Sequence, residues 1–487
     1  MLFGNFWLAF LAVFFLPLAE SLHVTPDIAD EHLRNVYDYI IVAGGTAGLT
    51  IANRLSENPA GLLPVPGTIG SGGWQKYQWG LTTEPQTYLN NQNVGIPQGK
   101  AVVHVSYPQY FYDQSFNVLE GLAELGLPII GDVNNGTAAG AMTLPSSMHP
   151  DNQTRFDARE AHFNSASSRY NLHIATNQTV TQLVLDSNSA YNSNRRVMGV
   201  EFAPNNKSKA RSISCTREVI VSAGAIFTPT LLQILGIGPS DVLKSLDIPV
   251  KIDLPDVGYN LQDHPMIYAN YYCRNESYLR SDEITDDVYD EVAEEYIRNR
   301  TGERKYLREG PSSGNGIPSN APNSVKKGYE VQRRILRQKG QFAVAAQKTF
   351  SRGTIQPSSS SIFDTPKLDP RYCSDTIDCE IIVLGLQMNT KLIQTNAMKE
   401  LMPEAESVFD TTDRESLMKQ VMEKITTERH PSGTAAMMAL ELGGVVDPEL
   451  KVYGTCNLRI ADASIMPLIP SAHLQASVYA IAEKVRL

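Results

Sequence analysis

A strand that runs directly into a glycine-rich turn is the feature that most constrains this chain. Residues 37–42 are β-formers, Gly44, Gly45 and Gly48 follow, and residues 49–55 carry apolar side chains at helical spacing. Such a turn lets backbone N–H groups approach a pyrophosphate, whose charge the positive end of the helix dipole stabilises. The spacing fits G-x-G-x-x-G except that Ala43 takes the first position. The turn therefore predicts a dinucleotide site, with an ordinary glycine-rich strand–helix turn as the alternative.

The stretch after the predicted helix departs from this pattern. A dinucleotide fold continues with a second parallel strand that ends in Asp or Glu, about 20 residues beyond the glycines, where the acid binds the ribose hydroxyls. Residues 60–73 are instead rich in Gly and Pro, and no acid occurs between Glu57 and Glu84. We therefore predict that the ribose acceptor is missing.

Length and charge narrow the classes of function. The chain has 487 residues, which a prior of about 150 residues per domain divides into two or three domains. The formal net charge is −10 and Lys and Arg form no cluster longer than a pair, so we expect no nucleic-acid partner. The five cysteines are too few and too scattered for a disulfide scaffold or a zinc site. Cys373 and Cys379 either close a small loop or are isolated buried thiols.

The first residues are typical of a secretory signal. An apolar run at 6–18 is followed by the small residues Ala19 and Ser21, so we predict a signal peptide at 1–21 and a secreted protein. No Lys or Arg precedes the run, which leaves an uncleaved anchor as the alternative. The run is too short to span a bilayer comfortably, so we expect no stable membrane anchor. Candidate N-glycosylation sequons begin at Asn135, Asn152, Asn177, Asn206, Asn275 and Asn299.

Three runs of β-formers occupy the middle of the chain, at Thr179–Leu185, Val197–Phe202 and Glu218–Ser222. Linkers rich in Asn, Ser and Lys join them, so we predict an antiparallel meander. The third run enters a second glycine turn at Gly224, after which we predict a helix with Pro229 in its first turn. Helical spacing also predicts helices at 115–125, 155–168, 282–298, 380–398 and 413–425.

In its motifs the chain resembles the glucose–methanol–choline (GMC) oxidoreductases, FAD-dependent alcohol oxidases and dehydrogenases, especially their secreted fungal members. The resemblance covers most of the mature chain and rests on residues 37–48, 224–239, 254–265, 430–437, 460–464 and 471–476. It implies an α/β fold in which a Rossmann-type FAD-binding domain is joined to a second domain of antiparallel sheet plus helices. The implied FAD domain is discontinuous and spans 22–105, 151–265 and 430–487, and the substrate-binding domain spans 106–150 and 266–429.

The resemblance also implies which residues contact FAD. They are Gly44, Gly45, Thr46, Ala47 and Gly48 at the pyrophosphate, the backbone of Val180 at the adenine, Asp462 and Ala463 on the flavin side, and Gln475.

His430 and His473 resemble the catalytic pair of the family. Both lie in short turn-like segments flanked by small residues, although a satisfied structural histidine is the commoner case for such a pair. Oxidising an alcohol requires a base for the hydroxyl proton while hydride leaves the carbon for a flavin, and histidine titrates in the right range for this base. We predict that His430 is the base and that His473 hydrogen-bonds the same oxygen. His264, next to Asp263, is interpreted as structural.

The predicted function is therefore FAD-dependent oxidation of the CH–OH group of a small-molecule alcohol: a sugar, an aryl alcohol or a secondary-metabolite intermediate. Oxygen or a quinone-type acceptor would reoxidise the flavin. Two blocks of the family pattern look absent, the strand with the ribose acid after Asn58 and a glycine- and serine-rich loop after Lys100. The alternative is a catalytically impaired or vestigial GMC-like secreted protein that lacks full FAD binding.

Overall fold

Two strands of apolar residues form the centre of the fold. In the computed structural model, β3 (Val36–Val42) and β9 (Arg211–Val221) lie parallel, with Ile40 opposite Val219 and Val42 opposite Val221. These four side chains are fully buried, as expected for parallel strands covered on both faces. The structure describes residues 33–57, 103–107, 114–131, 139–186, 194–271, 340–403, 409 and 411–485, together with short strands at 12–15, 22–24, 81–82 and 95–96.

The central pair belongs to an eight-stranded sheet in the order β2-β6-β1-β3-β9-β8-β7, with β17 also paired to β9. The other strands are β2 (Leu22–Val24), β6 (Leu172–Ala175), β1 (Ala12–Phe15), β8 (Val197–Ala203), β7 (Thr179–Leu185) and β17 (Leu458–Ile460). β7, β8 and the first half of β9 are antiparallel neighbours, so the meander is present, but its third strand lies before the predicted run, whose residues 218–221 pair parallel with β3. β17 runs parallel to the second half of β9. The carboxyl ends of β3, β9 and β17 therefore meet at one edge of the sheet.

The neighbour of β3 on its other side differs from the parallel strand that a dinucleotide fold places there. β1 lies between β3 and β6 and is antiparallel to both, with Val13 opposite Ile41 and Ile174. This strand comes from the segment predicted as a signal peptide, whose cleavage stays a prediction. The acid-free stretch 60–73 lies outside the described residues.

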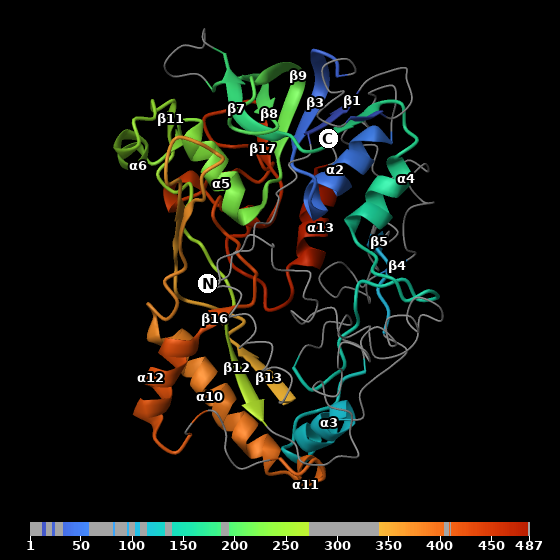
Figure 1. The fold of residues 1–487 in the computed structure, drawn as a ribbon, viewed down its shortest axis with the longest axis vertical. Helices are drawn as coiled ribbons and strands as arrows, with labels where there is room; N and C mark the ends of the chain where they lie inside the picture. Colours follow the sequence, from blue (N-terminus) through green and yellow to red (C-terminus); the bar gives the residue numbers. More distant parts are fainter. Residues whose placement is uncertain are drawn as a thin grey trace, which may run out of the picture.

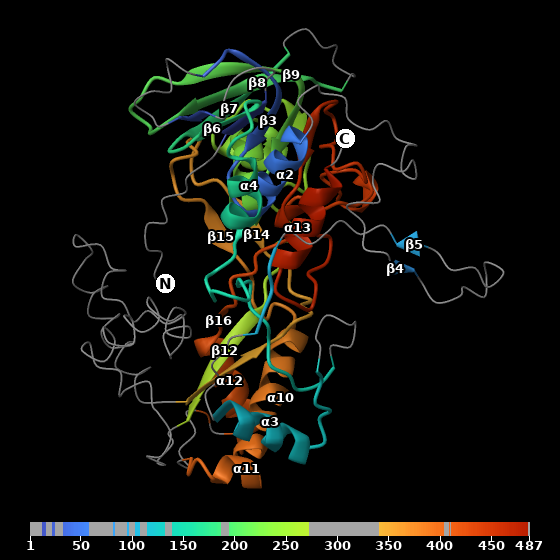
Figure 2. The same cartoon turned by 90° about the vertical axis from the view of Figure 1, so that its right-hand side faces the viewer.

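Helices cover the sheet. α2 (Thr46–Ser56) and α13 (Gln475–Lys484) lie side by side (Figure 2), and the guanidinium of Arg54 bonds both carboxylate oxygens of Glu483 at 2.7–2.9 Å. The predicted helix at 155–168 is shorter, and is formed by a π-helix at Arg159–Phe163 and α4 (Asn164–Ala166).

The helix after β9 begins earlier than predicted. α5 runs from Gly224 to Ile234, which places Pro229 inside the helix and corrects the first-turn assignment. Proline has no N–H to donate to the carbonyl four residues earlier. That carbonyl, on Ala225, instead accepts a hydrogen bond of 2.7 Å from the Thr434 hydroxyl. The carbonyl that Pro229 leaves without a helical donor therefore anchors the loop that follows His430 to α5.

A second group of elements lies at the other end of the molecule (Figure 1). β12 (Pro265–Tyr271) pairs antiparallel with β13 (Gly340–Ala345) and with β16 (Thr426–Thr427). α10 (Thr376–Ile393) and α12 (Arg414–Lys424) pack on them around a core that includes Ile267, Ile382, Leu386, Leu417 and Val421. α3 (Gln114–Glu124) and α11 (Asn396–Lys399) complete this end.

The helix predicted at 380–398 is divided. α10 begins at Thr376 behind the cap of Asp375, whose side chain accepts from the Ile377 N–H, and α11 begins behind the cap of Thr395. Cys373 and Cys379 form a disulfide at the start of α10, which settles the two alternatives for these cysteines. The helix predicted at 282–298 lies outside the described residues.

The remaining described elements are short connections. They are β4 (Leu81–Thr82), β5 (Gly95–Ile96), β10 (Ile237–Gly238), α6 (Ser240–Ser245), β11 (Ile252–Asp253), β14 (Thr354–Gln356), β15 (Lys367–Asp369) and 3-10 turns at Leu440–Leu442 and Ala463–Ile465. In the described part of the chain, no helix has the length and apolarity needed to cross a bilayer. The domain limits given above stay a prediction.

Candidate active site

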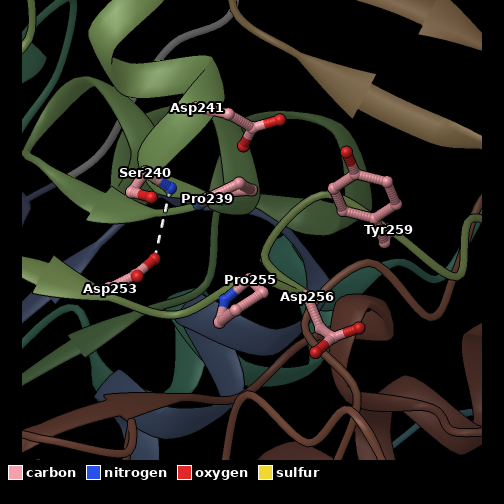
Figure 3. A pocket seen from close by; sticks show the side chains of 7 residues that line it. All are labelled: Pro239, Ser240, Asp241, Asp253, Pro255, Asp256 and Tyr259. Carbon is pink, nitrogen blue, oxygen red and sulfur yellow. Dashed lines mark hydrogen bonds between the residues drawn. The ribbon is translucent and has the colours of Figure 1, made fainter.

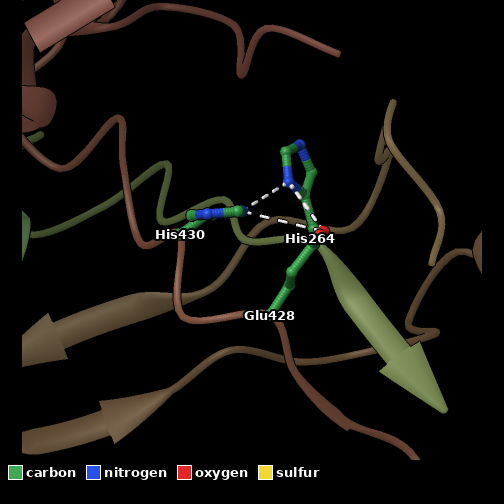
Figure 4. Close-up of side chains that lie close together, drawn as sticks. All are labelled: His264, Glu428 and His430. Atoms are coloured by element: carbon green, nitrogen blue, oxygen red, sulfur yellow. Dashed lines mark hydrogen bonds and ion pairs between the residues drawn. The ribbon is translucent and has the colours of Figure 1, made fainter. Parts of the chain in front are cut away.

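The pairing of β12 with β16 brings two distant segments together just outside the second sheet. Pro265 lies opposite Thr427, and the Glu428 N–H donates to the His264 carbonyl at 3.0 Å. The residues on either side of this pairing, 262–264 and 428–432, therefore run next to each other. This arrangement places His264, Glu428 and His430 in one cluster (Figure 4).

Asp263 fixes the backbone of both histidines in this cluster. One carboxylate oxygen accepts the N–H groups of His264 and His430, each at 2.8 Å. The other oxygen accepts the hydroxyls of Tyr372, at 2.6 Å, and of Thr427. Burial and the neighbouring carboxylate raise the pKa of Tyr372, so this hydroxyl stays protonated as a donor. One buried carboxylate thus positions both rings.

Two other side chains of the same segment, those of Gln262 and Asn260, hydrogen-bond the loops that carry His473 and His430. The Gln262 side chain accepts the Ile469 N–H at 3.1 Å and donates to the Pro467 carbonyl at 3.0 Å. Asn260 donates to the Gly433 carbonyl at 3.1 Å. Gly433 has φ +85°, and a Cβ there would lie 2.6 Å from the Asn260 carbonyl oxygen, so only glycine fits this close approach.

The structure brings the two predicted catalytic histidines together. The His430 and His473 rings meet edge to face with centroids 5.2 Å apart, and the His264 and His430 rings do so at 5.1 Å. The His264 ring is fully buried, the His430 ring is 15% exposed, and His473 is exposed. The cluster is therefore open on the side of His473 and closed on the side of His264.

Hydrogen-bond partners assign the tautomers of the two inner rings. Nε2 of His264 lies 3.1 Å from the Pro470 carbonyl oxygen, which only accepts, so Nε2 carries a hydrogen. Nδ1 of His264 lies 3.0 Å from Nδ1 of His430, so one of these two atoms donates to the other. When both rings are neutral, His264 accepts here and Nδ1 of His430 donates. Nε2 of His430 then keeps its lone pair and can accept a proton.

Glu428 is ionised next to these rings. Its Oε2 lies 3.3 Å from Nδ1 of His264 and 3.7 Å from Nδ1 of His430, and Gln347 donates to it at 2.9 Å. Burial acts to raise the pKa of Glu428, but the contacts with His264, His430 and Gln347 together outweigh it and hold the pKa well below its usual range. The cluster thus combines a carboxylate with two imidazoles.

The predicted pyrophosphate turn lies at the edge where β3, β9 and β17 end. α2 begins at Thr46, with Gly45 as its N-cap residue, without a side-chain cap and without an acid in its first turn, so its first N–H groups have no intrahelical partner. A Cβ on Gly45 would meet nothing within 4 Å, whereas one on Gly48 would lie 1.9 Å from the Ala43 carbonyl oxygen. Gly48 allows close packing, and the open, uncapped turn at Gly45 fits an anionic group.

The other residues of this turn differ in exposure. Gly44 and Thr46 are half-buried and Ala47 is buried. Ala43, which takes the place of the first glycine of the fingerprint, has φ +92°, a conformation that glycine adopts freely and alanine does not. Ala43, the residue that departs from the fingerprint, therefore has a strained backbone in this structure. Contacts of these residues with FAD stay a prediction.

Asp462 links the turns after β9 and β17. The side chain is fully buried, and it accepts the Gly224 N–H at 2.9 Å, the Thr228 hydroxyl at 2.6 Å and the Ser464 N–H at 2.8 Å. Burial raises the pKa of Asp462, and these hydrogen bonds oppose the shift. The carboxylate is occupied by protein donors, so its role in this structure is to hold the start of α5. Its contact with FAD, and that of half-buried Ala463, stay predictions.

The two remaining predicted cofactor contacts lie farther along the chain. Val180 lies in β7, where it pairs with Phe202 of β8 beside an irregularity in the strand pairing, and its side chain is buried. Gln475 begins α13, is exposed, and accepts from the Ser147 hydroxyl at 3.2 Å. The adenine and flavin contacts assigned to them stay predictions.

The predicted glycosylation sequons are partly visible. Asn152, Asn177 and Asn206 are exposed, and Asn135, Asn275 and Asn299 lie outside the described residues. Glycosylation stays a prediction at all of these positions.

A separate cavity of about 460 Å³ lies between α6 and the segment after β11 (Figure 3). Its lining consists of Pro239, Ser240, Asp241, Asp253, Pro255, Asp256 and Tyr259. The Ser240 N–H donates to Asp253 at 3.2 Å. The lining includes neither the predicted catalytic histidines nor the glycine turn, so this cavity is not the candidate active site.

Two side chains that contact His430 were not predicted as parts of the site: His264 was interpreted as structural, and Glu428 was not singled out. The available signal was local: Glu428 lies two residues before His430, after a run of β-formers, and Asp263 lies directly before His264. Only the antiparallel pairing of these segments, which are far apart in sequence, shows that they meet.

Comparisons with known proteins agree with the fold. Two family models, both described as GMC oxidoreductase, match residues 102–266 and 349–482. The chain is 26% identical to the GMC oxidoreductase family protein Mala s 12 of Malassezia sympodialis, over 92% of this chain and 91% of that protein. It is 26% identical to the dehydrogenase xptC of Emericella nidulans, over 96% and 95% of the two chains.

Solved structures of similar fold include an FAD-dependent oxidoreductase from Chaetomium thermophilum, with a TM-score of 0.72 and 25% identity over 92% of this chain and 98% of that one. A fungal aryl-alcohol oxidase also has a TM-score of 0.72, with 22% identity over 93% and 98%. The uncapped glycine turn fits the pyrophosphate of the cofactor that these relatives indicate, FAD. The chain belongs to the GMC oxidoreductase family.

Proposed function

We propose that this protein oxidises the CH–OH group of a small-molecule alcohol, with His430 as the base. The observation that carries this proposal is the contact of His430 with buried His264: the two Nδ1 atoms lie 3.0 Å apart, which leaves Nε2 of His430 for the substrate hydroxyl. His473 lies against the same ring and is exposed. Removal of the hydroxyl proton of an alcohol requires an unprotonated base, and a second imidazole can hydrogen-bond the same oxygen.

The chemistry follows from these two side chains. Nε2 of His430 accepts the hydroxyl proton while the neighbouring carbon gives up hydride, and a carbonyl product forms. FAD, when bound, supplies the hydride acceptor. His473 hydrogen-bonds the same oxygen and holds the substrate in orientation. Asp263 keeps the His430 backbone in place through the hydrogen bond of 2.8 Å.

The substrate class is proposed as a primary or secondary alcohol: a sugar, an aryl alcohol or a secondary-metabolite intermediate. Similar proteins are named as an aryl-alcohol oxidase and as an oxygen-dependent choline dehydrogenase from Pseudomonas savastanoi. Oxygen or a quinone-type compound is the proposed acceptor. We also propose that the protein is secreted, on the basis of the apolar run at 6–18.

The test is a panel of sugar, aryl and aliphatic alcohols with the purified protein, with and without an artificial electron acceptor. We expect a yellow protein whose flavin absorbance bleaches when the right alcohol is added without oxygen. A flavin-containing protein that no alcohol in the panel reduces would count against the proposal. Screening the culture medium and the cells separately tests secretion.

A second candidate function, a GMC-like protein with impaired FAD binding, is favoured by two observations. Ala43 has φ +92° in the pyrophosphate turn, and the sequence has no acid between Glu57 and Glu84 to bind the ribose. A colourless, folded protein that takes up no added FAD would support this second candidate. Bleaching by an alcohol would exclude it.

A further inference from the structure

Glu428 lies against the catalytic histidine but has no place in the proposed reaction so far. Its Oε2 lies within 4.0 Å of both inner rings, at 3.3 Å from Nδ1 of His264 and 3.7 Å from Nδ1 of His430. Figure 4 shows all three side chains converging, with both contacts of His430 on the same ring nitrogen. A partly buried carboxylate in this position acts on whatever charge the two rings carry.

We propose that Glu428 is a positioning residue: with His264 it fixes the tautomer of His430 and stabilises the positive charge that the histidine pair takes up with the substrate proton. This inference rests on the proposed function, because it assigns a role toward the same base. It adds a group that touches neither substrate nor cofactor and acts through His430.

The position of each proton supports this role. When both rings are neutral, one proton lies between the two Nδ1 atoms, which are 3.0 Å apart. When the substrate O–H bond breaks, its proton forms an N–H bond at Nε2 of His430, and the pair gains one positive charge. The charge rests on His430, or on His264 if the shared proton moves across to it. Glu428 lies within ion-pair distance of both positions, so it stabilises the charge in either case.

The other groups around the pair do not replace Glu428. The Asp263 carboxylate is engaged with two backbone N–H groups and two hydroxyls. Gln347 is neutral and donates to Glu428. His473 is a third imidazole beside His430 and supplies no negative charge. Glu428 is therefore the counter-charge of the pair among the described residues.

The test compares Glu428→Gln with a matched control, Glu218→Gln. Both carboxylates are paired with a basic group and are similarly exposed, at 21% for Glu428 and 15% for Glu218, which pairs with Arg459. Glu218 does not contact the histidine cluster. We expect Glu428→Gln to slow flavin reduction by roughly 10- to 1000-fold with unchanged flavin content. The control is expected to keep the wild-type rate.

The pH profile separates a positioning role from a merely structural one. Without the counter-charge the histidine pair is protonated less readily, so the acid limb of kcat/KM is expected to move to lower pH by about one unit. Glu428→Asp keeps the charge and should restore the limb and part of the rate. A Glu428→Gln protein with the wild-type limb and rate would overturn the proposal.

A second measurement does not depend on turnover. In the wild-type holoprotein with ¹⁵N-labelled histidine, we expect the His430 signal, assigned by comparison with His430→Asn, to show a protonated Nδ1 and an unprotonated Nε2. The opposite tautomer would overturn the proposal. If no alcohol is oxidised but the tautomer is as expected, the proposed function fails while the tautomer assignment stands.

Discussion

The histidine cluster and the glycine turn are the two halves of the candidate active site, and they are held in different ways. The polar side chains of half-buried Asn260 and buried Gln262 and Asp263 bond both histidine loops and fix their backbone. The turn after β3 is shaped by packing instead: Gly48 lies against the Ala43 carbonyl, and no side chain caps α2. Hydrogen bonds within the protein hold the histidine backbones, whereas the uncapped N–H groups at the start of α2 are left for an anionic ligand.

This difference predicts how each half responds to change. Removing a donor or acceptor at the histidine cluster leaves another buried polar group without a partner, which costs free energy of folding and misplaces a ring. Changing the turn alters backbone strain and the space left for the cofactor. Mutations at the first half should therefore act on rate and stability, and mutations at the second on stability and cofactor affinity.

The largest expected effect is that of His430→Ala. Loss of a general base typically lowers the rate by about 10²–10⁴-fold, so stopped-flow flavin reduction should fall by that factor. Flavin content, measured by absorbance after purification, should stay near the wild-type value because the glycine turn is untouched. An equal loss of flavin and of rate would show that the two halves are not independent.

The sequence predicts one half better than the other. The strand, glycines and helix of the predicted pyrophosphate turn are contiguous, and local patterns predict them. Local patterns also predict the antiparallel pair of β7 and β8, but not that residues 218–221 of β9 pair parallel with β3. The cluster of Glu428 with His264 depends on the pairing of β12 with β16, and no local pattern encodes a pairing between segments so far apart. The start of α5 at Gly224 was missed for a similar reason: Asp462 holds its first N–H, and Thr434 satisfies the carbonyl that Pro229 leaves free.

Asp263→Ala should produce the next largest effect, on stability. It removes the acceptor of the His264 and His430 N–H groups, and two unsatisfied buried donors cost about 2–5 kcal/mol of unfolding free energy. Asp263→Asn is the matched control, since one oxygen remains for the N–H groups and the hydroxyls of Tyr372 and Thr427 can accept from the amide. Denaturant unfolding of both variants measures the difference. Equal losses would mean that charge, and not hydrogen bonding, holds the cluster.

His473→Ala tests whether the exposed ring is a helper or a second base. A hydrogen bond to the substrate oxygen accounts for roughly a 5- to 20-fold change in rate, so flavin reduction should slow far less than in His430→Ala. The ring is exposed, so unfolding free energy should change little. A loss as large as that of His430→Ala would exchange the roles of the two histidines.

The smallest effect is expected at the strained residue of the glycine turn, from Ala43→Gly. Alanine at φ +92° costs on the order of 1–3 kcal/mol, and glycine relieves this strain while adding about 0.5–1 kcal/mol of unfolded-state entropy. The net gain in unfolding free energy should be about 1 kcal/mol, with FAD bound at least as tightly as in the wild type. Ala47→Gly, inside the first turn of α2 where no such strain exists, is the control and should lose about 1 kcal/mol. If Ala43→Gly were as destabilising as Ala47→Gly, the turn would not be the strained half of the site.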